Sequence, residues 1–170
     1  MNPKTTPTRS EKQCHKLFIS ELVTAFICGY IIYGLAGTLE TGLDLRLIIP
    51  GAILIFVLLQ GTAYWYYRRQ EARGTSMDRP LILKIFALLK KVTPYILCLY
   101  PLLIIYLLLR EPQQLWVPFN IFGIILWAFA LIEFTNNYYF NVRLGNLKHR
   151  APSDLALELD AESHRKGVKK

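Results

Sequence analysis

Two acidic residues lie inside long apolar segments of the sequence, where a charge is expensive. Glu21 lies near the start of the apolar run Leu17–Leu39, and Glu133 lies in the run Leu115–Phe140. A carboxylate at membrane depth costs on the order of 2.5–3.5 kcal/mol on insertion scales, so such residues face protein or water and mark structural contacts or ion pathways. The chemistry indicated first is therefore hydrogen bonding, or proton and cation binding, inside a membrane.

Both carboxylates share a helical face with small or amide side chains, at about 100° per residue. The first stripe consists of Glu21, Ala25, Cys28, Gly29 and Ala36. The second consists of Gly123, Ala130, Glu133, Asn137 and Asn141, with Asn136 beside it. Small residues let another helix approach closely. We therefore expect Glu21 and Glu133 to face the interior of a helical bundle.

Several other polar residues are candidates for the same buried site. Gln60, next to Gly61 and Thr62, is a candidate for the polar core, although helix packing is the commoner role of such a trio. Four basic residues at the level of the two acids are candidate charge partners: Lys84, Lys90, Lys91 and Arg143. Two interpretations follow. The polar residues hold the helices in register, or Glu21 or Glu133 binds the proton or cation of a small secondary transporter.

Two resemblances bear on these interpretations. Four spans with an acidic residue in the first resemble the architecture of small multidrug resistance exporters, which work as dimers, and the resemblance implies an ion-coupling role for Glu21 alone. The longer chain, its basic tails and Glu133 depart from that pattern. The stretch Glu133–Phe140 is similar to a Glu-aromatic-x-Asn-x-Tyr stretch in the last span of small bacterial membrane proteins of uncharacterised function. That second resemblance implies no activity.

Signatures of enzymes and of cofactor binding are missing from the sequence. His15, His149 and His164 lie in the tails or flanks, and the three cysteines are not at metal-ligand spacing. The sequence has no HExxH, GxSxG or P-loop motif. We therefore expect no catalytic site, no cofactor and no bound metal.

The elements that must position these residues are transmembrane helices. The chain has 170 residues, of which 53% are hydrophobic and 19% charged, and the apolar residues form blocks long enough to cross a bilayer. The blocks predict an all-α bundle over residues 17–140, with spans at 17–39, 47–67, 92–109 and 115–140.

The third span poses a problem of length. The apolar stretch Leu81–Leu109 is too long for one bilayer crossing, and its first part carries three lysines. We expect residues 81–91 to form an amphipathic segment at the membrane interface, followed by the span. One long helix that extends out of the bilayer is the alternative.

The basic residues indicate the orientation. Residues 1–16 are expected to form a disordered basic tail, and residues 141–170 a second basic tail with a short helix starting near Pro152 and bearing Leu155 and Leu159. Of the twenty Lys and Arg, eighteen lie on the side of the two tails and only Arg46 and Arg110 on the other. This asymmetry predicts cytoplasmic termini in the cell membrane. Because the basic residues flank apolar blocks, the net charge of +8 does not indicate nucleic-acid binding.

The sequence thus predicts a multi-pass protein of the lipid bilayer that lacks a catalytic site. Its first expected role is structural or accessory, through association with itself or with another membrane protein. The alternative is a small proton- or cation-coupled transporter, and only that alternative involves a small-molecule or ion substrate.

Overall fold

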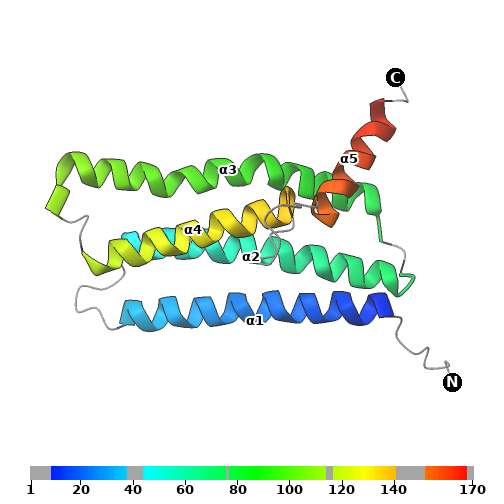
Figure 1. Ribbon diagram of the computed structural model, residues 1–170, viewed down its shortest axis with the longest axis horizontal. Helices are drawn as coiled ribbons and strands as arrows, with labels where there is room; N and C mark the ends of the chain where they lie inside the picture. The colour runs from blue at the N-terminus through cyan, green and yellow to red at the C-terminus, as the bar shows by residue number, and fades with distance from the viewer. Residues whose placement is uncertain (1–8, 38–43, 76, 114–116, 141–151, 168–170) are drawn as a thin grey trace.

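Helices make up nearly all of the structure, a computed structural model that describes residues 9–37, 44–75, 77–113, 117–140 and 152–167. They are α1 (Arg9–Gly37), α2 (Leu45–Ala72), α3 (Arg79–Arg110), α4 (Pro118–Tyr138) and α5 (Asp154–Gly167). The first four are long and apolar enough to cross a membrane, which confirms the predicted all-α multi-pass fold. They run side by side, and both chain termini lie at the same end (Figure 1).

Local capping explains where two of these helices begin. Asp44 accepts a hydrogen bond from the Arg46 backbone N–H at 2.9 Å and so caps the start of α2. Asp78 does the same for α3 through the Leu81 N–H at 3.2 Å, and Pro80 occupies the first turn, where no N–H is needed. The turn after α2 contains Gly74 with a φ of 74°, a left-handed conformation that glycine adopts without strain.

The first helix begins earlier than the sequence suggested. Residues 9–16 continue α1 as helix, so the prediction of a disordered tail over residues 1–16 is wrong for this part, and residues 1–8 lie outside the described residues. Two contacts hold the extension: Cys14 is buried, and Arg73 Nε lies 2.6 Å from Glu11 Oε1. The Arg73 contact comes from the end of α2, far along the chain, so no local pattern could indicate it.

The third helix has no break between Lys91 and Val92, so the alternative of one long helix is the one observed. The prediction that residues 81–91 form a separate interfacial segment is therefore wrong, although the lysines of these residues do lie at one end of the bundle. In the second tail, the predicted short helix is α5, and residues 141–151 lie outside the described residues.

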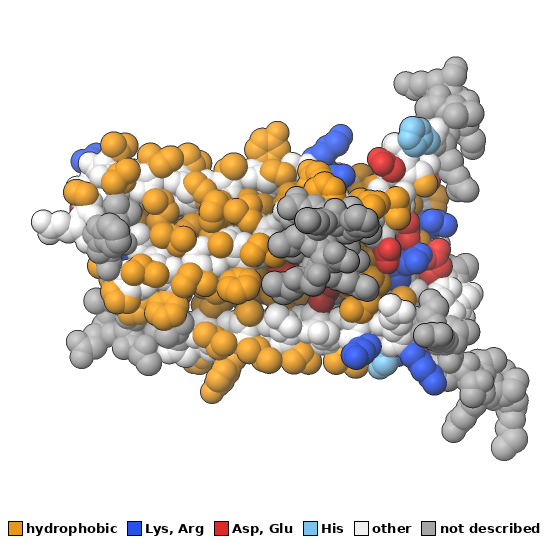
Figure 2. Space-filling model, viewed as in Figure 1, with side chains coloured by type: hydrophobic (Ala, Val, Ile, Leu, Met, Phe, Trp, Pro, Cys, Tyr) orange, Lys and Arg blue, Asp and Glu red, His pale blue; other side chains and the backbone are white. Residues whose placement is uncertain are grey.

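The core lies around α2. In the most apolar part of α2, 61% of the residues are buried inside the protein. In the corresponding parts of α1, α3 and α4, 6%, 17% and 22% of the residues are buried. α1 packs along one side of α2 and α4 along another, and α3 lies against α2 and α4. Large side chains such as Tyr64, Leu97, Tyr100, Phe134 and Tyr138 fill the space between them. The other helices present broad apolar outer surfaces, as a lipid environment requires (Figure 2).

Charges concentrate at the end that carries both termini, which we call the basic end (Figure 2). It contains the last turns of α2, the first turns of α3 and the helix α5. The opposite end holds Asp44, Arg46 and Arg110.

Candidate polar sites in the helical bundle

Glu21 lies between α1 and α2, held by an indole. Trp65 Nε1 donates a hydrogen bond of 2.8 Å to Glu21 Oε1. Glu21 Oε2 is buried and has no hydrogen-bond partner among the described residues. A Cβ atom at Gly61 would overlap Glu21 Oε2 and would lie 3.1 Å from Asn137 Nδ2. Side chains from α1 and α4 therefore meet over the bare backbone of α2 at Gly61.

Glu133 lies half-buried on α4, in the same region of the bundle. Asn136 is its hydrogen-bond partner, one turn along the helix. Glu133 is close enough to Glu21 for like-charge repulsion to act between the two carboxylates.

The predicted charge partners do not neutralise these acids. Among the described residues, Lys84, Lys90 and Lys91 form no ion pair with Glu21 or Glu133. Lys90 Nζ instead lies 4.7 Å from the centre of the Tyr139 ring, in a cation–π contact. Arg143 lies outside the described residues. The assignment of the three lysines as partners is therefore wrong, because all three line a groove between α3 and α5.

The predicted polar core residue Gln60 joins three helices. Its amide donates to Thr93 Oγ1 on α3 at 3.2 Å, and its Oε1 accepts a hydrogen bond of 2.8 Å from Tyr138 OH on α4. Gln60, Thr93 and Tyr138 are 5%, 0% and 0% exposed. A buried network of neutral groups whose hydrogen bonds are made fixes helix positions. Thr93 and Tyr138 are not among the residues predicted from the sequence. The signal for each was a hydroxyl side chain inside an apolar run.

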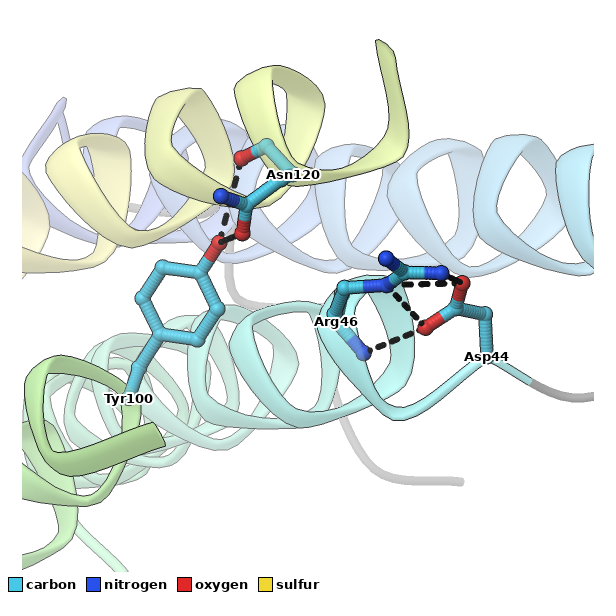
Figure 3. Close-up of polar contacts among 4 residues, drawn as sticks. All are labelled: Asp44, Arg46, Tyr100 and Asn120. Carbon is cyan, nitrogen blue, oxygen red and sulfur yellow. Dashed lines mark hydrogen bonds and ion pairs between the residues drawn. The ribbon is translucent and has the colours of Figure 1, made fainter. Parts of the chain in front are cut away.

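A second polar group at the opposite end was not predicted. Tyr100 OH lies 3.1 Å from the Asn120 backbone O and 3.3 Å from its Oδ1, so α3 is joined to the start of α4 (Figure 3). Close by, the Arg46 guanidinium binds both carboxylate oxygens of Asp44 (Figure 3). These hydrogen bonds from Arg46 hold the pKa of Asp44 below its ordinary value. Gly123 permits the approach, since a Cβ there would overlap both Tyr100 OH and the Arg46 carbonyl.

The helix α5 closes the basic end through an ionic cluster. Glu158 Oε1 lies 2.8 Å from Arg68 Nη1, and Glu158 Oε2 lies 3.9 Å from Arg79 Nη2. Burial raises the pKa of the Glu158 carboxyl, and the two arginines oppose that rise. Leu155 is buried beneath the helix. Ser153 Oγ donates to the Asn137 carbonyl at 2.8 Å and caps α5, so it ties α5 to the end of α4.

Taken together, the hydrogen bonds and ion pairs of these sites join neighbouring helices. Within the described ranges, no group of three His, Cys, Asp or Glu side chains is arranged to hold a metal ion. Described members of the two expected stripes lie against the rest of this chain: Gly29 lies beside Ile55, and Ala25, Gly123 and Ala130 are buried. Asn141 of the second stripe lies outside the described residues. Comparison with known protein families, curated proteins and solved structures finds no match to this chain.

Proposed function

We propose that this chain is a non-enzymatic protein of the cell membrane that works by associating, through the outer face of α1, with a second copy of itself. The polar side chains of the two stripes do not support this proposal, because Glu21 is bonded to Trp65 of α2 and Glu133 to Asn136 of its own helix. Of the α1 stripe, only the small residues Ala25 and Gly29 border the surface used here. The outer surface of α1 does support the proposal, since only α2 packs broadly against this helix and its remaining surface is free within the described structure.

A groove beside a ridge is the observation that carries the proposal. The groove, of about 490 Å³, runs between α1 and α2, with Ala25 and Gly29 at its floor. Phe26, Tyr30 and Tyr33 form the ridge, and they are 71%, 78% and 79% exposed. A small-residue floor admits the bulky side chains of another helix.

The ridge on α1 lies beside the groove between α1 and α2, so the surface is self-complementary. In a two-fold symmetric pair, the same patch of each copy meets the other, and the ridge of one copy can enter the groove of the next. Dispersion and packing drive helix association in lipid, where apolar burial alone gives little. Aromatic rings in a fitted groove supply that packing.

Disulfide cross-linking tests this arrangement directly. In a variant without Cys14, Cys28 and Cys98, a cysteine is introduced by Tyr30→Cys or, as the matched control on the next residue, by Ile31→Cys. Tyr30 and Ile31 are both exposed and lie about 100° apart around α1. Oxidation in membranes should give a covalent dimer with Tyr30→Cys only. Equal cross-linking of the two variants would contradict the proposal.

The orientation is part of the proposal. The support for cytoplasmic termini is the excess of Lys and Arg at the basic end, where both termini lie. In the same cysteine-free background, an impermeant thiol reagent added to intact cells should modify Thr41→Cys and leave Thr75→Cys unmodified. The reverse pattern would invert the orientation.

A second candidate function is a proton- or cation-coupled transporter that uses Glu21 or Glu133. It is favoured by the buried Glu21 Oε2, which lacks a hydrogen-bond partner among the described residues, and by the repulsion from Glu133. Such a pair of acids without a basic partner is typical of intramembrane ion sites.

Reconstituted vesicles distinguish the two candidates. If the carboxylates transport protons, the native chain should dissipate an imposed pH gradient and Glu133→Gln should not, because an amide cannot release a proton. The structural role predicts that both proteins leave the gradient intact and that Glu133→Gln remains folded.

A further inference from the structure

A groove between the first turns of α3 and the helix α5 combines charged and apolar walls. It has a volume of about 850 Å³. Its α3 wall carries Lys84, Lys91 and Tyr95, its α5 wall carries Leu159 and Asp160, and Tyr139 lies at the end of α4 between them. Figure 2 shows basic side chains of α3 beside acidic ones of α5 in this part of the surface.

Two lysines in this groove are available to a ligand. Lys84 and Lys91 are seven residues apart, so they project from nearly the same side of α3. Both are exposed, and neither forms an ion pair within the described part of the chain. Lys90, by contrast, is engaged with the Tyr139 ring. The two free ammonium groups thus form a site for an anion.

The depth of the site in the bilayer follows from the length of α3. The apolar part of this helix from Val92 to Leu109 spans about 27 Å, close to the thickness of the hydrocarbon core. Lys91 and Lys84 therefore lie at and just beyond the hydrocarbon boundary, where lipid phosphates lie. Pro94 and Tyr95, in the same groove, lie at the level of the acyl chains. The groove therefore spans the boundary between headgroups and acyl chains.

We propose that this groove binds a phospholipid with a single net negative charge, with its phosphate between Lys84 and Lys91 and an acyl chain along Pro94 and Tyr95. A soluble anion would use the lysines and leave the apolar half empty. Asp160 and Glu162 stand on the α5 wall, and they disfavour headgroups that carry further negative charges. The site thus distinguishes singly charged from multiply charged lipids.

A matched pair of double variants tests the proposal. Lys84→Gln/Lys91→Gln removes the two groove charges, and Lys12→Gln/Lys16→Gln removes two exposed charges from α1 at the same basic end. The native protein and both variants are purified in a neutral detergent, and binding of phosphatidylglycerol and of phosphatidylcholine is titrated by native mass spectrometry. Thermal unfolding without added lipid checks that both variants are folded.

The groove variant should bind phosphatidylglycerol at least about tenfold more weakly than the native protein, and the α1 variant should bind like the native protein. Phosphatidylcholine should bind the native protein more weakly than phosphatidylglycerol. Equal losses in the two variants, or equal binding of the two lipids by the native protein, would overturn the proposal. Displacement of the lipid by millimolar inorganic phosphate would identify a site for free phosphate and would overturn it as well.

Discussion

Trp65 Nε1 on α2 donates a hydrogen bond of 2.8 Å to Glu21 Oε1 on α1, and this bond joins the outermost helix of the bundle to its centre. A carboxylate in an apolar segment requires such a donor, because a buried polar group without one is costly. The contact explains how α1, which packs mainly against α2, is fixed in register along it.

Removing either partner of this bond should weaken the bundle. Trp65→Phe removes the donor and should lower the free energy of unfolding by roughly 1–2 kcal/mol, the range for interhelical hydrogen bonds in model peptides. Glu21→Leu should have a similar effect, whereas Glu21→Gln keeps an oxygen acceptor and should cost less. Thermal unfolding in detergent measures all three. A Glu21→Gln variant as unstable as Glu21→Leu would show that charge, and not the hydrogen bond, matters at this position.

Three glycines should respond differently to alanine. A Cβ at Gly123 would overlap the Arg46 backbone carbonyl, which cannot move aside, so Gly123→Ala should destabilise the protein most. At Gly61 the overlapping atom is the end of the Glu21 side chain, so Gly61→Ala should cost less, through the Trp65 bond that Glu21 must give up. At Gly34 nothing lies within 4 Å, and Gly34→Ala should stabilise the helix by up to about 1 kcal/mol. Unfolding temperatures in any other order would contradict these packing relations.

The four long apolar helices could be predicted from the sequence, because hydrophobic length decides their number. The polar face of α1 could also be predicted, since Glu21, Ala25 and Gly29 do share one side. The identity of the helix that covers this face could not be predicted, because small residues accept a helix of the same chain as readily as a helix of a partner chain. Here the covering helix is α2.

Other features depended on contacts between distant residues. Gln60 was identified as a polar core residue, but its partners Thr93 and Tyr138 lie 33 and 78 positions away and only the fold brings them together. The helical state of residues 9–16 depends likewise on Arg73. The three lysines near the start of α3 suggest a divided helix from the sequence alone, but one long helix places them at the basic end without any break.

The ion pair between Asp44 and Arg46 predicts a dependence of stability on pH. The folded-state pKa of Asp44 is lowered, so its stabilising contribution is complete above the ordinary aspartate pKa of about 4 and is lost as the pH falls through the lower folded value. Asp44→Asn keeps a capping side chain and removes the charge. It should be about 0.5–1 kcal/mol less stable than the native protein at pH 7. The two melting curves should converge in acid; a constant difference at every pH would contradict the role of the charge.

Docking of α5 should depend on Leu155. Leu155 is 3% exposed, whereas Leu157 on the same helix is 53% exposed. Leu155→Ala should weaken docking by about 2 kcal/mol and speed hydrogen exchange in residues 154–167. Leu157→Ala is the matched control and should leave exchange unchanged. Similar exchange in both variants would show that the ion pairs of Glu158, and not Leu155, hold the helix.

The number of chains per particle in a bilayer tests the central claim, association through α1, most directly. Singly labelled protein, reconstituted in liposomes at a low protein-to-lipid ratio, is counted by single-molecule photobleaching. We expect two bleaching steps for the native chain, one step for the ridge variant Phe26→Ala/Tyr30→Ala, and two for the control Ile27→Ala/Ile31→Ala on another face of α1. Single steps for the native protein across the accessible range of dilution, or two steps retained by the ridge variant, would contradict the account.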